Sequence, residues 1–243
     1  MTDAARRASA IVIVPTYNER ENLPILIEGL LRYDHVRVLI VDDQSPDGTG
    51  QLGDEFGTRF PGRVRVLHRT SARGYGRSCM DGVRHAIGED VELVCLMDGD
   101  LSHDPGDLGA ILAAARDADM VIGSRYIPGG RIVNWPIRRS VLSRFANIYI
   151  RLVTRLNVRD CTSGYRCWRR DALRKVPLDN IRSDGYSFLT EMLFRTARCR
   201  LRIAEVPITF VERRLGESKL SAGVLIESLI TPWRLVATRN GGR

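Results

Sequence analysis

Short runs of apolar, often β-branched residues alternate along the chain with stretches whose apolar residues recur three or four positions apart. Ala10–Thr16 and residues 36–41 favour strands. The segment between them favours a helix, with apolar positions at Leu23, Leu26, Ile27, Leu30 and Leu31. Further strands are predicted at residues 63–67, 92–97 and 120–123, and further helices around residues 78–87 and after Pro105. This alternation predicts the α/β fold class, with a mostly parallel central sheet flanked by helices.

The pattern changes after Tyr126, where P-G-G leads into a basic segment around Arg138 and Arg139. A helix is predicted from residue 140 to about residue 156. Because no long Pro-, Ser- or Gly-rich linker and no repeat interrupts the chain, we expect one domain over residues 1–243.

Charge and cysteine usage narrow the classes of partner. The chain carries 37 Lys and Arg against 29 Asp and Glu, which favours nucleic acid, phosphorylated ligands or an anionic membrane face. Nucleic acid is disfavoured because the aromatic residues are sparse and are not interleaved with basic ones. The five cysteines lack paired C-x-x-C spacing, so we expect free thiols in a reducing cytosol.

Neither end of the chain predicts membrane insertion. The first ten residues lack a separate signal-peptide core, and the apolar segment 224–236 is broken by Glu227, Pro232 and Arg234. That segment is also shorter than the ~20 residues that a spanning helix needs. We therefore expect no transmembrane helix and a cytoplasmic location.

Asp98 and Asp100 lie in C-L-M-D-G-D-L-S-H-D-P, directly after a predicted buried strand and on either side of Gly99. Two neighbouring carboxylates suit Mg²⁺ or Mn²⁺ that also binds a nucleotide diphosphate and water. An ordinary acidic turn and helix cap is the alternative, but the position at a strand end favours the metal. His103 is expected to be a loop histidine outside the ligand set.

Carboxylates also follow the first two predicted strands, where ligands reach such sheets. Asp42 and Asp43 precede Q-S-P-D-G-T-G, and we expect Asp43 to contact a base or ribose while the other carboxylate of the pair braces the turn. P-T-Y-N-E, after the first strand, offers the aromatic ring of Tyr17 and the carboxylate of Glu19.

Two basic groups are candidates for phosphate binding. Arg213 and Lys219 lie on either side of Gly216 in a segment that could fold over a diphosphate, although a solvated basic surface is the alternative. The second group follows the strand at 120–123 and comprises Arg125, Arg138, Arg139, Ser143 and Arg144.

Seven motifs of the chain, taken together and in order, resemble those of the dolichol-phosphate or polyprenol-phosphate mannosyltransferases. They are P-T-Y-N-E-R-E-N-L, V-D-D-Q-S-P-D-G-T-G, M-D-G-D-L-S-H-D-P, G-S-R-Y, S-R-F-A-N, T-S-G-Y-R and F-V-E-R-R-L-G-E-S-K-L. These enzymes are family 2 glycosyltransferases of the GT-A fold. The resemblance runs from about residue 11 to residue 220. It implies a nucleotide-sugar-binding half at about 10–125 and an acceptor-side half at about 126–220. The residue pattern beyond the resemblance predicts an amphipathic segment at about 221–236.

The resemblance also implies roles for individual residues. The nucleoside pocket would be lined by Pro15, Tyr17, Glu19, Val41 and Asp43. Asp98, Gly99 and Asp100 would surround the metal and the diphosphate, with Asp98 and Asp100 as its ligands. Arg125, Arg213 and Lys219 would bind donor phosphates. Arg125, Arg139 and Ser143 would bind the acceptor phosphate.

The implied reaction transfers mannose from GDP-mannose to a polyprenyl (dolichyl-type) phosphate with inversion, using Mg²⁺ or Mn²⁺. The implied setting is peripheral contact with the cytoplasmic face of a membrane, with or without a membrane-anchoring partner protein, and no nucleic acid. A UDP-sugar-dependent polyprenyl-phosphate glucosyl- or hexosyltransferase is the alternative. The sequence departs from the family pattern at Gly99, where alanine is usual, at Tyr75, within the commoner G-L-G, and at Leu189, where glutamine is frequent.

Membrane contact is predicted for two segments, the helix near residues 138–155 and the apolar stripe of Val224, Leu225, Leu229 and Trp233. Packing of that stripe into the core is an equal alternative.

Overall fold

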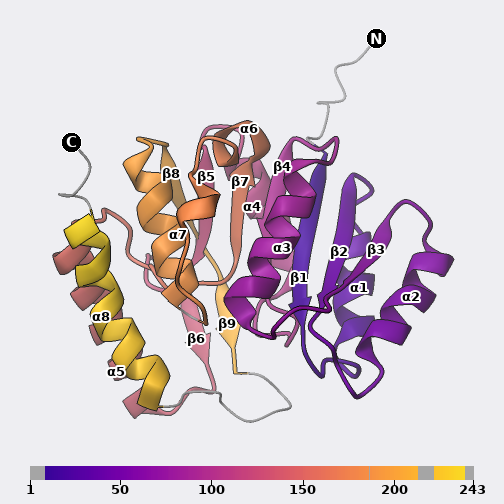
Figure 1. Ribbon diagram of the computed structural model, residues 1–243, viewed down its shortest axis with the longest axis horizontal. Helices are drawn as coiled ribbons and strands as arrows, with labels where there is room; N and C mark the ends of the chain where they lie inside the picture. Colours follow the sequence, from indigo (N-terminus) through magenta and orange to yellow (C-terminus); the bar gives the residue numbers. More distant parts are fainter. Residues whose placement is uncertain (1–8, 186, 213–221, 239–243) are drawn as a thin grey trace.

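The computed structural model describes residues 9–185, 187–212 and 222–238, and within these ranges it shows an α/β fold with helices on both faces of one large sheet (Figure 1). The sheet has seven strands in the order β3-β2-β1-β4-β7-β5-β8. These strands are β1 (Ala10–Thr16), β2 (Val36–Asp42), β3 (Val64–His68), β4 (Leu93–Leu96), β5 (Met120–Ser124), β7 (Arg166–Arg169) and β8 (Ile203–Pro207). The predicted fold class is confirmed.

The sheet is parallel except at one strand. β1 pairs in parallel with β2 and β4, β2 with β3, and β5 with β8. β7 runs antiparallel between β4 and β5. The sequence did not predict β7, whose four residues R-C-W-R begin and end with arginine and are too few to show a period.

The helices divide between the two faces of the sheet. Behind the sheet in Figure 1 lie α1 (Leu23–Leu31), α2 (Thr49–Arg59) and α4 (Leu108–Ala114), the last preceded by the short η1 (Pro105–Asp107). In front lie α3 (Tyr75–Ile87) and α7 (Ser187–Arg198). The short α6 (Arg170–Leu173) and η2 (Leu178–Asn180) connect β7 to α7.

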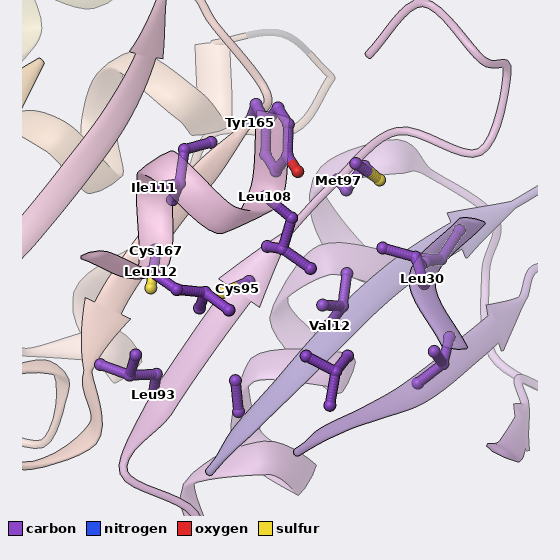
Figure 2. Close-up of a cluster of buried hydrophobic side chains, with 14 of the residues drawn as sticks. Val12, Leu30, Leu93, Cys95, Met97, Leu108, Ile111, Leu112, Tyr165 and Cys167 are labelled. Carbon is purple, nitrogen blue, oxygen red and sulfur yellow. The ribbon is translucent and has the colours of Figure 1, made fainter. Parts of the chain in front are cut away.

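Each face of the sheet has its own core. Figure 2 shows the core behind the sheet, where Val12 and Cys95 of the strands lie in one buried cluster with Leu30 of α1 and Leu108 of α4. The core in front of the sheet joins β1, β2 and β4 to α3 and α7. Because successive strand residues point to opposite faces, the apolar runs predicted as strands supply both cores.

All five cysteines are free thiols, as predicted, although Cys95 and Cys167 lie opposite each other on β4 and β7. Burial raises the pKa of Cys161 to about 12, and the hydrogen bond with Cys167, together with burial, raises the pKa of Cys95. These thiols are therefore protonated core groups.

Two long helices, α5 (Ile137–Thr154) and α8 (Ala222–Thr238), lie side by side beyond the β8 edge of the sheet (Figure 1). α5 begins three residues before the predicted start because Pro136, in extended conformation, is its N-cap. A small parallel sheet of β6 (Arg131–Val133) and β9 (Thr209–Val211) lies below the main sheet. Within the described residues, no helix is long and apolar enough to cross a membrane.

Candidate active site

The predicted site residues gather where the strand order changes direction. β1 leads to β2 and β3 on one side, while β4 adds to the other side of β1. Ligands of open α/β sheets bind beyond the carboxyl ends of strands at such a switch point. The loops after β1, β2 and β4 each hold one non-glycine residue at positive φ, namely Asn18, Gln44 and Leu101. Backbone strain of this kind is concentrated at functional sites.

Asp98 follows β4 at this switch point and is held on three sides. Its Oδ1 accepts a hydrogen bond of 2.7 Å from the Tyr75 hydroxyl at the start of α3. Its Oδ2 lies 3.7 Å from Nδ1 of His103. A Cβ added to Gly164 would lie 2.8 Å from Oδ2 and 2.9 Å from Oδ1, so the carboxylate packs directly against the Gly164 backbone. This close packing explains why the motif T-S-G-Y-R has a glycine at position 164.

Asp100 lies two residues on and is buried. Its Oδ1 accepts a hydrogen bond of 3.1 Å from the backbone N–H of Ser102. Gly99 between the two carboxylates packs on β1, because a Cβ there would lie 3.3 Å from the Pro15 carbonyl oxygen. An alanine at position 99 therefore needs a shift of only a few tenths of an ångström.

The chemistry of the two carboxylates fits a hard divalent cation. Among the described residues, no cluster of three or more His, Cys, Asp or Glu side chains forms a metal cage. One or two carboxylates are a set of protein ligands that Mg²⁺ and Mn²⁺ accept when a diphosphate and water supply the other ligands, and Asp98 and Asp100 match that set. Because Gly164 has no Cβ, the Asp98 carboxylate has space where such an atom would lie.

His103 is fully buried behind the two carboxylates, which the sequence did not predict. Its ring lies between those of Tyr165 and Phe210, at centroid distances of 5.2 Å to each. Nδ1 faces the backbone N–H of Asp98 at 3.4 Å, and Nε2 has no hydrogen-bond partner among the described residues. Burial lowers the pKa of His103. The histidine is a neutral support beneath the acidic loop rather than a solvated loop residue.

Asp43 follows β2 and is held by partners that the sequence did not reveal. Its Oδ1 pairs with the guanidinium of Arg69, and its Oδ2 accepts a hydrogen bond of 2.8 Å from the Gly74 N–H. Nε of Arg69 also donates to Asp81 of α3 at 2.8 Å. Burial lowers the pKa of Arg69, but hydrogen bonds and charge from Asp81 and Asp43 outweigh it, and the pKa ends above its usual value.

The other predicted nucleoside-pocket residues occupy different depths. Tyr17 lies under Arg73, whose Nη1 donates a 2.6 Å hydrogen bond to the phenol oxygen. Glu19 accepts a 2.7 Å hydrogen bond from Asn22. Pro15 is buried in β1, and the Val41 side chain is buried in the core in front of the sheet, so only its backbone borders the switch point.

Asp42 has the turn-bracing role that was predicted for one carboxylate of the pair. Its Oδ2 accepts the N–H of Ser45 at 3.2 Å, and its Oδ1 lies 3.4 Å from the Thr16 hydroxyl.

Arg125 follows β5 and forms a buried ion pair with Asp160. Nε and Nη2 of the guanidinium donate hydrogen bonds of 2.7 Å each to the two carboxylate oxygens. Burial raises the pKa of Asp160, but the charge and hydrogen bonds of Arg125 outweigh it and hold the pKa below its usual value. The guanidinium also lies against the rings of Tyr126, Trp135 and Phe210. Arg125 is thus a fixed cation with a committed partner, and phosphate binding by it stays a prediction.

Arg139 and Ser143 lie in the first two turns of α5, on the same side as Arg125 and its aromatic neighbours. Arg139 stacks on Trp135 at 4.1 Å and donates a 2.6 Å hydrogen bond to Glu212. Ser143 accepts a 2.7 Å hydrogen bond from the Tyr126 hydroxyl. Their predicted binding of the acceptor phosphate is not tested by these contacts. Arg213 and Lys219 lie outside the described residues.

The loop that carries Gly164 is fixed by Arg166, a fully buried arginine of β7. Its guanidinium donates to the backbone carbonyls of Ser163 at 2.7 Å and Cys161 at 2.8 Å, and to that of Leu189 in α7. Burial lowers its pKa to about 10. The T-S-G-Y-R motif was the sequence signal for this arrangement. Tyr75 was noted only as a departure from the family pattern, and Arg69 and Asp160 offered no signal beyond their residue types.

A large exposed apolar surface lies on α5 and α8, and we call it the helical face. It comprises Ile137, Val141, Leu142, Phe145, Ile148, Leu152, Leu229, Ile230 and Trp233. Leu229 is 52% exposed and Trp233 61% exposed, so core packing does not explain these two residues of the predicted stripe. The side chains of Val224 and Leu225 lie outside the described set. Arg138 and Arg144 are exposed on α5 among these residues.

Comparison with known proteins agrees with this architecture. The chain is 47% identical to an undecaprenyl-phosphate mannosyltransferase of Micrococcus luteus, over 96% of this chain and 97% of the relative. It is 44% identical to a polyprenol monophosphomannose synthase of Mycolicibacterium smegmatis, over 90% of this chain and 83% of the relative. A dolichol-phosphate mannosyltransferase of Pyrococcus furiosus is 35% identical over 93% of this chain and 63% of the relative.

Among solved structures, glucosyl-3-phosphoglycerate synthase of Mycobacterium tuberculosis in complex with Mn²⁺, uridine diphosphate and glucosyl-3-phosphoglycerate has the same fold. The TM-score is 0.68 at 17% identity, with 99% of this chain and 82% of that chain covered. Residues 11–177 match the family described as Glycosyl transferase family 2. The chain therefore belongs to glycosyl transferase family 2.

Proposed function

We propose that this protein transfers mannose from GDP-mannose to a polyprenyl phosphate, giving a β-linked polyprenyl mannosyl phosphate and GDP. The observation that carries the proposal is the 47% identity to an undecaprenyl-phosphate mannosyltransferase over 96% of the chain. The geometry supports it, because Asp43, Asp98 and Asp100 converge at the sheet edge where an α/β fold binds a nucleotide.

The donor half orients the nucleotide sugar. Asp43, fixed by Arg69 and Gly74, presents its carboxylate beside the loop of Tyr17. A carboxylate accepts hydrogen bonds, which suits the N–H groups of a base or the hydroxyls of a ribose. Pro15, Glu19 and the backbone of Val41 complete this side of the proposed nucleoside pocket.

Asp98 and Asp100 would hold Mg²⁺ or Mn²⁺, which when bound offsets the negative charge that grows on the departing diphosphate. Arg213 and Lys219 are proposed to bind the same diphosphate. Gly99 lets Asp98 and Asp100 lie against β1 beside the donor.

The reaction requires no side-chain base. An oxygen of the polyprenyl phosphate, already ionised near neutral pH, forms a bond to the anomeric carbon as the bond from that carbon to GDP breaks. Attack from the face opposite GDP inverts the configuration. The protein aligns the acceptor phosphate with the anomeric carbon, and we assign this role to Arg125, Arg139 and Ser143. These residues lie at the junction of the sheet edge and α5.

The acceptor's hydrocarbon chain requires access from a lipid surface, and we propose that the helical face rests on the cytoplasmic face of a membrane. Exposed apolar side chains with arginines among them suit an anionic lipid interface, to which each basic residue contributes ~1 kcal/mol. Where a membrane-anchoring partner protein is present, we propose that it binds the helical face. Catalysis does not require this partner in the proposal.

A donor screen with purified protein tests the proposal. With Mn²⁺ and polyprenyl phosphate in detergent, labelled GDP-mannose is expected to give a labelled lipid. UDP-glucose and UDP-galactose are expected to give at least tenfold less. Higher transfer from a UDP-sugar than from GDP-mannose would replace the proposal with the UDP-hexosyltransferase alternative.

A further inference from the structure

The first turn of α3 reaches three acidic residues from separate parts of the chain. The N–H of Gly74 donates to Asp43, the hydroxyl of Tyr75 donates to Asp98, and the N–H of Gly76 donates to Asp184 at 3.2 Å. Asp43 follows β2, Asp98 follows β4, and Asp184 precedes α7. Three consecutive residues therefore connect the proposed nucleoside pocket, the proposed metal site and the segment before α7.

The two glycines of G-Y-G pack against Asp184 and Phe188. A Cβ on Gly74 would lie 2.6 Å from Oδ2 of Asp184, and a Cβ on Gly76 would lie 2.9 Å from Cβ of Phe188 and 3.1 Å from Oδ1 of Asp184. A side chain at either position would therefore displace its neighbours. Position 75 lies between them, and its side chain extends to Asp98.

The hydroxyl of Tyr75 donates an oriented hydrogen bond of 2.7 Å to Oδ1 of the Asp98 carboxylate. His103 lies farther away, at 3.7 Å from Oδ2, and Gly164 offers packing alone. The side chain of Asp98 is 24% exposed, and the hydrogen bond from Tyr75 restrains its orientation. A leucine at position 75 would have no donor for the carboxylate.

We infer that Tyr75 is a positioning residue that fixes the Asp98 carboxylate for a divalent cation and its nucleoside diphosphate. The inference rests on the proposed metal site of the proposed function. A partner that hydrogen-bonds a metal-binding carboxylate fixes its orientation, and loss of such a partner typically lowers metal affinity about 10- to 100-fold.

The test compares Tyr75→Phe, which removes only the hydroxyl, with Tyr165→Phe as the matched control. Tyr165 is adjacent to Gly164, but its hydroxyl is buried with no hydrogen-bond partner among the described residues. Mn²⁺ binding is measured by electron paramagnetic resonance at a fixed concentration of GDP. Circular dichroism and thermal unfolding confirm that each variant is folded.

Tyr75→Phe is expected to raise the Kd for Mn²⁺ about tenfold or more, while Tyr165→Phe leaves it unchanged. Tyr75→Leu is expected to match Tyr75→Phe, and it serves as the second variant if the phenylalanine protein does not fold. Excess Mn²⁺ is expected to restore turnover of Tyr75→Phe, which it would not do for a damaged fold.

An unchanged or lower Kd in both Tyr75 variants overturns the inference while leaving the proposed function intact. Absence of Mn²⁺ binding by the wild-type protein contradicts both the inference and the metal site. Mannosyl transfer that fails with every donor, together with a weakened Mn²⁺ affinity in Tyr75→Phe, overturns the proposed function alone.

Discussion

Folded proteins usually bury apolar side chains and expose charged ones, and two regions of this protein depart from that pattern in opposite ways. The carboxyl edge of the sheet buries charged groups, and the helical face exposes apolar ones. At the sheet edge, charged groups such as Asp43, Asp100 and Arg125 are buried, and each has at least one polar partner. On the helical face, large apolar side chains such as Phe145 and Trp233 are exposed. Buried charges and extended apolar surfaces are both informative departures, because each costs free energy in an unliganded protein.

The difference indicates two kinds of ligand. Preset charges with fixed partners need no rearrangement when a charged group binds, so the sheet edge suits a metal diphosphate. An exposed apolar surface gains free energy when water leaves it, so the helical face suits a lipid interface. Arg125 and Arg139 lie near the junction between the two regions, where a lipid-borne phosphate would meet a nucleotide sugar.

The strongest test of the buried polar region is removal of charge from the Arg125–Asp160 pair. Asp160→Asn leaves Arg125 buried without its counter-charge, which we expect to lower the free energy of unfolding by about 3–5 kcal/mol at pH 7. Equilibrium denaturation in urea measures the change. Glu205→Gln, which alters the half-exposed residue beneath Asp160, is expected to have a smaller effect.

The same pair predicts a dependence on pH. The pKa of Asp160 in the folded state is lower than in the unfolded state, so its contribution is complete at neutral pH. It is lost as the pH falls through the folded value, below about pH 4. Unfolding curves measured from pH 7 to pH 3 should therefore show a smaller acid destabilisation in Asp160→Asn than in wild type. Equal slopes would contradict the ion pair.

Asp100→Ala tests the proposed chemistry of the sheet edge. Loss of a metal-binding carboxylate is expected to lower transfer on the order of 10²- to 10³-fold, because charge on the leaving diphosphate is no longer offset. Circular dichroism should remain that of the folded protein. Near-normal turnover in this variant with Mn²⁺ present would remove Asp100 from the site.

Two glycines near Asp98, one adjacent in sequence and one packed on its carboxylate, give a sharper comparison. A Cβ at Gly164 would lie 2.8 Å from Oδ2 of Asp98, whereas one at Gly99 meets its nearest atom at 3.3 Å. Gly164→Ala is therefore expected to displace Asp98 and lower donor turnover about 10- to 100-fold, and Gly99→Ala should retain activity within about twofold. Steady-state kinetics with varied Mn²⁺ measures both, and equal effects would disprove the packing argument.

The smallest expected effect concerns the helical face. Ile148→Ala on α5 removes apolar surface that we propose enters lipid. Burying one methylene group gains ~0.8 kcal/mol, so the partly exposed isoleucine should strengthen vesicle binding, and its loss should weaken binding to anionic phospholipid vesicles about threefold to tenfold. Ile25→Ala is the matched control, because Ile25 of α1 is 55% exposed and Ile148 is 52% exposed. Co-sedimentation at low and high salt separates the apolar and electrostatic parts. Equal binding by both variants would exclude α5 as the lipid contact.

Much of the fold followed from periodicity, because buried parallel strands and amphipathic helices leave strong local patterns. The bounds of β1 were predicted residue for residue, and α1 buries four of the five predicted apolar positions. The antiparallel β7 was missed, since R-C-W-R is held as a strand by pairing with the distant strands β4 and β5 rather than by local propensity. α7 was missed as well, although its nine buried residues make it central to the core in front of the sheet.

The sequence predicted the acidic residues of the candidate site, but it did not predict the residues that pair with the site's charged side chains. Asp43, Asp98 and Asp100 follow strands, and that position is visible in a sequence. Arg69, Tyr75 and Asp160 act across separations of 23 to 35 residues, which no local pattern encodes. The pairing of Arg125 with Asp160 is the main addition, because the sequence predicted only a phosphate-binding cation.

The account depends most directly on a divalent cation held by Asp98 and Asp100. Mannosyl transfer from GDP-mannose to polyprenyl phosphate should be measured with purified protein before and after excess EDTA, and again after Mn²⁺ is restored. We expect EDTA to reduce transfer to background and Mn²⁺ to recover it. Transfer that continues unchanged in excess EDTA would contradict the central claim.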